Sequence, residues 1–243
     1  MSKAIFLKRV VLNNYRSIKA CSVTLGPLTF LVGQNGSGKS NFLDALRLVT
    51  ESLNTSLEHA LRERGGIKET GRRPLGDETH FAIRLEWQLT NGQEGFYAFR
   101  IISKGKSGFE IQREECHVEN PKTQESHHYI VANGDVKSCS FEVAPPAFSD
   151  RLYLVAASGL PPFRPIYDAL SHMGFYNLNP DAIRELQSPD PGEVLKRDGS
   201  NLARVLSMMA KENKEAYRRV IDLISKITPR ITDVKSIEVG KKE

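Results

Sequence analysis

The sequence predicts an α/β fold in which a mixed sheet surrounds a glycine-rich loop and the helix that follows it, with an antiparallel β arm and a helical lobe. Three observations lead to this prediction: a G-x-x-x-x-G-K-S motif at 33–40, period-2 apolar segments with Asn-Gly turns, and helical apolar stripes near the C-terminus. The expected parts are an α/β core at 1–75, a β arm at 76–146 and a mainly helical lobe at 147–243 that ends on a strand.

The motif has the flanks that a phosphate-binding loop requires. Residues 28–32, Leu-Thr-Phe-Leu-Val, are apolar or β-branched and predict a buried strand before the loop. A strand, a glycine loop and a helix in this order favour the motif over the alternative, a chance glycine-rich turn. After the loop, apolar residues recur at the spacing of one helix face, namely Phe42, Ala45, Leu46, Val49 and Leu53.

The residue types of the loop suit a nucleotide. Glycines adopt backbone conformations closed to other residues, so several N–H groups can converge at the positive end of a helix and bind an anion. Lys39 would reach the β- and γ-phosphates and the Ser40 hydroxyl would bind Mg²⁺, so ATP and Mg²⁺ are the expected cofactors. The residues assigned to nucleotide binding are Gly33, Gln34, Asn35, Gly36, Ser37, Gly38, Lys39, Ser40 and Asn41.

Hydrophobic periodicity and turn signals predict the elements of the core and the arm. Around the loop, strands are expected at 4–12 and 18–25, with a turn at Asn13-Asn14, and helices are expected to about residue 53 and at 57–64. Asn-Gly pairs, which favour two-residue hairpins, should join strands of the arm at 91–92 and 133–134. The expected strands of the arm are 79–90, 95–103, 108–118, 127–132 and 136–143.

The lobe is less regular. Residues 151–157 predict either a strand or the start of a buried helix, and 231–239 alternates like a strand. Asp198-Gly199-Ser200 offers an N-cap for the last helices. The expected helices of the lobe lie at 166–173, at 181–186 and within 202–227.

Composition excludes several classes of protein. The 243 residues are 40% hydrophobic and 26% charged, which is typical of globular proteins, and no apolar run is long enough to cross a membrane. The N-terminal residues lack the apolar core of a signal peptide, and three widely spaced cysteines favour the reduced thiols of a cytoplasmic protein over disulfides or a zinc site.

His117, His127 and His128 lack the spacing of metal ligands, which favours a surface or hairpin role. The net charge of +5 permits a nucleic-acid partner without demonstrating one.

The first 55 residues resemble the ATPase heads of the SMC, RecF and OLD group of the ABC superfamily. The resemblance rests on Asn14-Tyr15-Arg16-Ser17-Ile18 and on residues 28–45, where Ser40-Asn41-Phe42 replaces the Ser-Thr-Leu usual in ABC transporters. A second run within 175–203 resembles RecF-like bacterial AAA family ATPases, some of which serve phage defence with nuclease partners. The resemblance implies a P-loop NTPase fold and an ABC-type head that is incomplete in this chain.

The family also implies partners and further site residues. A homodimer of heads, DNA, and a nuclease or toxin effector subunit are the expected partners, with no membrane. Arg16, Arg62 and Arg64 are candidates for sensing DNA or nucleotide, although cations at a helix end would explain Arg62 and Arg64 equally well. Asn179 is a candidate Mg²⁺ ligand in the region where SMC proteins have a glutamine, and capping of the helix that begins at Pro180 is the alternative.

Phosphoryl transfer also requires an acidic residue after an apolar strand. None is found: 151–157 is followed by Ser158-Gly159, Val220-Ile221-Asp222 has a helical pattern, and Ile231-Thr232-Asp233 is too short. We therefore assign no catalytic residue and expect ATP hydrolysis to need a further segment and a second head. Two functions remain open, a head that couples ATP-driven dimerisation to DNA or to a nuclease, and a non-hydrolysing nucleotide-gated scaffold; an ABC transporter ATPase is disfavoured.

Overall fold

A computed structural model describes residues 5–72, 79–89, 92–105, 108–187 and 190–237. The chain divides into two compact units, unit 1 at 1–173 and unit 2 at 174–243, and each is described by itself.

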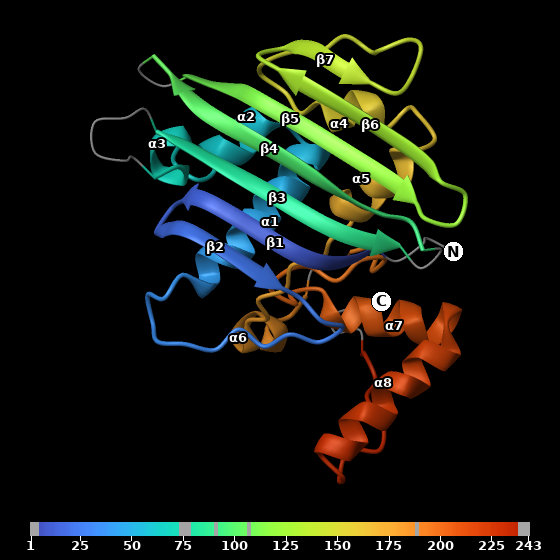
Figure 1. The fold of residues 1–243 in the computed structure, drawn as a ribbon. Helices are drawn as coiled ribbons and strands as arrows, with labels where there is room; N and C mark the ends of the chain where they lie inside the picture. The colour runs from blue at the N-terminus through green and yellow to red at the C-terminus, as the bar shows by residue number, and fades with distance from the viewer. Residues whose placement is uncertain (1–4, 73–78, 90–91, 106–107, 188–189, 238–243) are drawn as a thin grey trace. The chain divides into compact units, whose positions relative to one another are not determined.

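Unit 1 is built on one seven-stranded sheet in the order β2-β1-β3-β4-β5-β6-β7 (Figure 1). Every neighbouring pair of strands is antiparallel. The strands are β1 (Ile5–Tyr15), β2 (Ile18–Thr24), β3 (His80–Leu89), β4 (Glu94–Lys104), β5 (Gly108–Asn120), β6 (Glu125–Ala132) and β7 (Asp135–Cys139).

The predicted mixed sheet is wrong for the described residues, because all of the strand pairs are antiparallel. The predicted buried strand at 28–32 is also wrong, since this segment has no ladder partner in the described part of the chain. Its side chains at Leu28, Phe30 and Val32 are 75%, 78% and 91% exposed. A central strand is buried only when neighbouring strands satisfy its backbone groups and helices cover its faces, and no described strand pairs with this segment.

The turn chemistry of the arm is confirmed where the structure describes it. Asn133 and Gly134 have φ values of 52° and 81°, as a two-residue hairpin requires, and join Ala132 to its partner Asp135. Asn91 of the other predicted Asn-Gly turn lies outside the described residues. The predicted turn at Asn13-Asn14 is wrong. The hairpin of β1 and β2 has its turn at Arg16 and Ser17, because the two strands pair as far as Tyr15 and Ile18.

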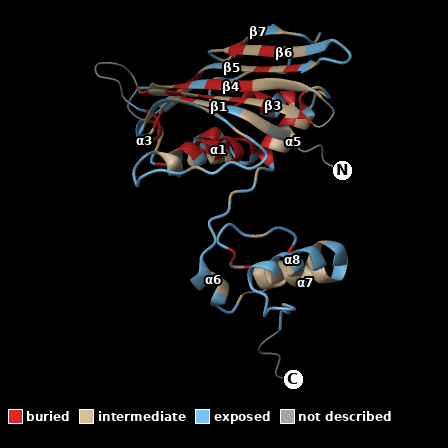
Figure 2. Ribbon diagram, turned by 60° about the horizontal axis from the view of Figure 1, so that its bottom comes forward, coloured by how far each residue is buried: buried red, intermediate tan, exposed pale blue. Residues whose placement is uncertain are grey.

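Helices of unit 1 cover one face of the sheet (Figures 1 and 2). The strict alternation of β3 turns its large apolar side chains to this inner face and its polar side chains, together with Ala82, to the outer face. The predicted apolar stripe of α1 is confirmed, since all five of its residues are buried. Residues 151–157, left open between strand and helix, contain a helix. The helices are α1 (Lys39–Asn54), α2 (Leu57–Arg62), α3 (Ile67–Thr70), α4 (Tyr153–Ala157) and α5 (Arg164–Ser171).

The sheet crosses the boundary expected between core and arm. Strand β1 pairs with β3 over eight positions, so strands from 1–75 and from 76–146 share one sheet. The three-part domain division stays a prediction, whereas the sheet itself is continuous.

Unit 2 contains α6 (Pro180–Arg184), α7 (Leu202–Glu212) and α8 (Lys214–Ile227), and none of these helices has a buried residue. The N-cap of α7 is Asn201 rather than a residue of the predicted Asp198-Gly199-Ser200. The Asn201 side chain bonds to Lys196 N, Asp190 Oδ1 and Val194 O, and so holds the preceding loop. Residues 231–237 of the predicted last strand form no strand, and 238–239 lie outside the described residues.

Candidate functional site

The loop at 33–40 ends in the first turn of α1. Gly36 and Gly38 have φ values of 80° and 96°, a region of backbone space that favours glycine, and Gly38 is the N-cap of the 16-residue α1. The loop residues around Gly36 are exposed, and a Cβ added at Gly36 would meet nothing within 4 Å. An open glycine loop at the positive end of a helix is a suitable site for an anion.

Lys39 places a positive charge over this loop. Its Nζ donates hydrogen bonds of 2.8 Å to the carbonyl oxygens of Gly33 and Gln34 and one of 3.3 Å to Ser37 Oγ. In the part of the chain that the structure describes, no carboxylate forms an ion pair with it. The ammonium group is therefore held by neutral oxygens, which orient its charge without neutralising it.

The hairpin turn between β1 and β2 contacts the start of α1. Asn41 Nδ2 donates a 2.6 Å hydrogen bond to Ser17 Oγ, and a Cβ at Gly38 would lie 3.3 Å from Ile18 Cγ1. The Ser40 side chain is exposed beside this contact. The structure thus brings together the loop, Asn41 and the turn that contains Arg16.

A charged network fixes α1 to this turn. The carboxylate of Asp44 accepts a 2.8 Å hydrogen bond from the Tyr15 hydroxyl, and Arg16 Nε lies 3.1 Å from its Oδ2. Burial and the neighbouring carboxylate raise the pKa of Tyr15, so its hydroxyl stays protonated and donates. The sequence patterns did not single out Asp44. The signal that could have found it is its position one turn after Ser40, on the face of α1 that contacts β1.

Arg64 belongs to the same network. Its side chain is 4% exposed. Its Nη1 lies 2.6 Å from Glu51 Oε2 and donates a 2.8 Å hydrogen bond to Ala60 O. Its Nη2 lies 3.1 Å from Asp44 Oδ1. These contacts give Arg64 a structural role, fastening the end of α2 to α1. Arg62 is exposed on α2, and the Arg16 side chain is 32% exposed. Sensing of DNA or nucleotide by the three arginines stays a prediction.

A family model described as "AAA ATPase domain" matches residues 6–137, more than half of the chain. This chain belongs to the AAA ATPase domain family. The match contains the glycine loop, Asp44 and Arg64, so the geometry described above lies within the family region, whereas Asn179 lies outside it.

The curated relatives of this AAA ATPase domain include proteins named for a nuclease, for DNA replication and repair, and for the maintenance of chromosomes. The OLD nuclease of Thermus scotoductus is 33% identical over 100 residues, which are 41% of this chain and 18% of the relative. The DNA replication and repair protein RecF of Trichlorobacter lovleyi is 53% identical over 45 residues, which are 18% of this chain and 12% of the relative. Structural maintenance of chromosomes protein 1 of Schizosaccharomyces pombe is 28% identical over 118 residues, which are 44% of this chain and 10% of the relative.

The chain spans less than a fifth of the length of these curated relatives. Together with the family match they show an ATPase region of the SMC/RecF/OLD-like ABC type, which confirms the predicted resemblance.

Other predicted positions have local roles. Asn179 caps α6, since its Oδ1 accepts a 3.0 Å hydrogen bond from Asp181 N; a role in Mg²⁺ binding stays a prediction. His117 and His128 bond across strands to Ser126 and Ser138. The three cysteines are free thiols. Within the described residues, no helix has both the length and the apolar character needed to cross a bilayer.

Proposed function

We propose that this AAA ATPase domain binds Mg²⁺-ATP at residues 33–41 and acts as the nucleotide-binding part of a P-loop head. The observation that carries the proposal is Lys39, whose ammonium group is held over the loop by two carbonyl oxygens at 2.8 Å, while none of the described carboxylates neutralises it. The β- and γ-phosphates of ATP would supply the missing negative charge.

The residues present fit the cofactor. The loop amides and the N-terminus of α1 would hold phosphate oxygens, Lys39 would contact the β- and γ-phosphates, and the exposed Ser40 hydroxyl would bind Mg²⁺. Bound Mg²⁺-ATP would supply a phosphoryl group that can be transferred to water. The Asp44–Arg64 network contributes by fixing the direction of α1, and therefore of its first turn.

The names of the relatives support a finer function within this proposal. Proteins named RecF and OLD nuclease suggest that this head couples ATP-driven dimerisation to DNA sensing or to control of a nuclease partner, in DNA repair or in phage defence. Hydrolysis would then use an acidic residue from outside the described residues and a second head that closes over the γ-phosphate. The alternative is a nucleotide-gated scaffold that binds ATP without hydrolysing it.

Titration calorimetry with Mg²⁺-ATP tests nucleotide binding directly. The wild-type chain should bind, and Lys39→Ala should weaken the affinity at least tenfold, about 1.4 kcal/mol, because the charge on the phosphates is lost. Lys137→Ala is the matched control, since Lys137 lies on β7, the edge strand farthest from β2 in the order of the sheet. Equal affinities for wild type and Lys39→Ala would refute the proposal.

A second experiment separates the two functions. In a protein that contains this chain and its effector, an ATPase head should turn over ATP faster when DNA is added. A scaffold would hold its effector equally well with ATP and with a non-hydrolysable analogue, and would show no turnover.

A further inference from the structure

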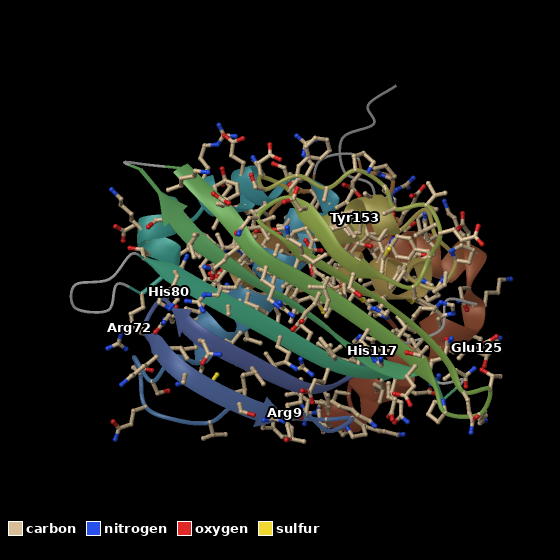
Figure 3. All side chains as sticks on the ribbon, turned by 45° about the horizontal axis from the view of Figure 1, so that its top comes forward. Arg9, Arg72, His80, His117, Glu125 and Tyr153 are labelled. Atoms are coloured by element: carbon tan, nitrogen blue, oxygen red, sulfur yellow. The ribbon has the colours of Figure 1, made fainter. Side chains whose placement is uncertain are left out.

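The outer face of the sheet carries a cluster of arginines that the nucleotide site does not use. No described element of residues 5–173 covers this face, which Figure 3 views with Arg9 of β1 and His117 of β5 labelled. A depression of about 190 Å³ lies on it, and the charged residues that line it are Arg84, Arg100 and Arg113 from three successive strands together with Glu115.

The strand register places these arginines close together. Arg100 on β4 lies directly opposite Arg113 on β5, next to a bulge in which β5 has one extra residue. On its other side Arg100 faces Ala82 of β3, and Arg84 faces Ala98 of β4. The two alanines form a small, apolar floor below the arginine side chains because neither fills the space above the sheet.

The charges around Arg100 are not balanced. Arg9 and Arg84 share the carboxylate of Glu86, at 3.9 Å and 2.9 Å, and Arg113 pairs with Glu115 at 2.9 Å. Arg100 is exposed and has no ion-pair partner among the described residues. Around Arg100, four arginines therefore lie with two glutamates, whereas Glu94 and Glu119 oppose each other at the other end of β4 and β5 on the same face. Arg100 and Arg113 form a directly opposed pair of like charges, an arrangement that is unfavourable without an anion.

Aromatic rings lie beside the arginines. The rings of Phe96 and His117 stack across β4 and β5 with centroids 5.9 Å apart, and the Arg84 guanidinium lies 3.6 Å from the Phe96 centroid. This stack orders Arg84. It also places partly exposed aromatic side chains beside a row of arginines that crosses four strands. A row of arginines fits a polymer with one phosphate per unit, and aromatic surface next to it fits bases rather than the side chains of an acidic peptide.

We propose that the outer face of the sheet binds single-stranded nucleic acid, with a backbone phosphate seated between Arg100 and Arg113 above Ala82 and Ala98. Arg84 and Arg9 extend the contact along the backbone, and the Phe96–His117 stack borders the bases. The proposal names a surface for the nucleic-acid partner in the proposed function, but it does not depend on nucleotide binding, because the helices and the loop lie on the other face.

Fluorescence anisotropy of the full chain with a labelled single-stranded 20-mer, without ATP, tests the proposal. Arg100→Gln should weaken binding about fivefold or more and lower the slope of log Kd against log salt by about one, because one phosphate contact is lost. Arg164→Gln, which removes an exposed arginine of α5 from the helical layer, should bind like wild type.

Three results would overturn the proposal: no binding by wild type, equal losses for Arg100→Gln and Arg164→Gln, or competition by polyglutamate as strong as by unlabelled oligonucleotide. None of them bears on the calorimetric titration with ATP, so failure of this surface and failure of the nucleotide site are distinguishable. Trp87 fluorescence checks that each variant is folded, since this single tryptophan is 1% exposed in the core of unit 1.

Discussion

Unit 1 and unit 2 use similar hydrophobic patterns to different effect. In unit 1, apolar residues of β3 and α1 face each other, and side chains such as Leu48 and Leu85 are fully buried. In unit 2, α7 and α8 have apolar stripes just as regular, yet none of their residues is buried. Periodicity therefore predicts a helix, whereas burial requires a second surface, and the stability of each unit should follow its burial rather than its pattern.

Removal of the buried arginine should give the largest effect. Arg64→Ala removes a buried guanidinium together with its contacts to Asp44, Glu51 and Ala60 O, although Asp44 keeps Arg16 and Glu51 keeps Arg47. The loss of these charge-assisted hydrogen bonds and of the packing of the side chain is expected to destabilise unit 1 by about 3–5 kcal/mol. Urea unfolding followed by Trp87 fluorescence measures it. Arg204→Ala in unit 2 removes an arginine whose one hydrogen bond to a described residue goes to Asp190 O, and should cost less than about 1 kcal/mol by far-UV circular dichroism. A comparable loss in both units would contradict the comparison.

A core truncation should come next. Leu48→Ala creates a cavity between α1 and its surroundings and is expected to cost about 2–5 kcal/mol, because Leu48 is fully buried. Ile224→Ala removes a partly exposed side chain from α8 and should cost about 1 kcal/mol or less. Fluorescence and circular dichroism should also give separate transitions, with unit 2 unfolding at the lower urea concentration; coincident transitions would count against this.

A buried carboxyl group should make unit 1, specifically, sensitive to pH. Glu114 is 1% exposed and accepts hydrogen bonds from two tyrosine hydroxyls and from Tyr153 N and Leu154 N at the start of α4. Burial outweighs these donors and raises the pKa of Glu114 from 4.5 to about 7. The folded state therefore holds a proton that the unfolded state releases, and stability falls as pH rises from about 4.5 to 7.

The expected fall is about 3 kcal/mol over this window, with no further loss from this group above it. Fluorescence-detected urea unfolding of wild type and Glu114→Gln at a series of pH values measures it, because the variant cannot titrate here. A difference between the two proteins that stays constant with pH would disprove the assignment.

The smallest effect concerns a cap in unit 2. Asn179→Ala removes the hydrogen bond to Asp181 N and should destabilise α6 by about 1 kcal/mol, measured by circular dichroism. Asn213→Ala, which removes the corresponding cap of α8, is the control. If Asn179 also binds Mg²⁺, only Asn179→Ala should weaken the Mg²⁺ dependence of ATP affinity.

Most of the fold that could be predicted follows from patterns among residues close together in the sequence. Alternation located the strands of the arm to within two residues, apart from the end of β7, and the Asn-Gly pair at 133–134 fixed its hairpin. The glycine loop and α1 also follow from neighbouring residues. The Asp44–Arg64 ion pair joins residues 20 apart, so no local pattern reveals it. Glu114 faces inward because the bulge beside Arg113 shifts the alternation of β5, which the sequence does not show.

The exposed segment at 28–32 has a consequence for the energetics of the loop that follows it. Covering each of Leu28, Phe30 and Val32 would contribute about 1.5–3 kcal/mol. Any polypeptide that pairs with this segment would restrict the backbone that leads into Gly33. The conformational entropy lost in this ordering would then no longer weaken the binding of the nucleotide. The two binding events would therefore be positively cooperative, each strengthening the other by the same factor, although no atom of the polypeptide need touch ATP.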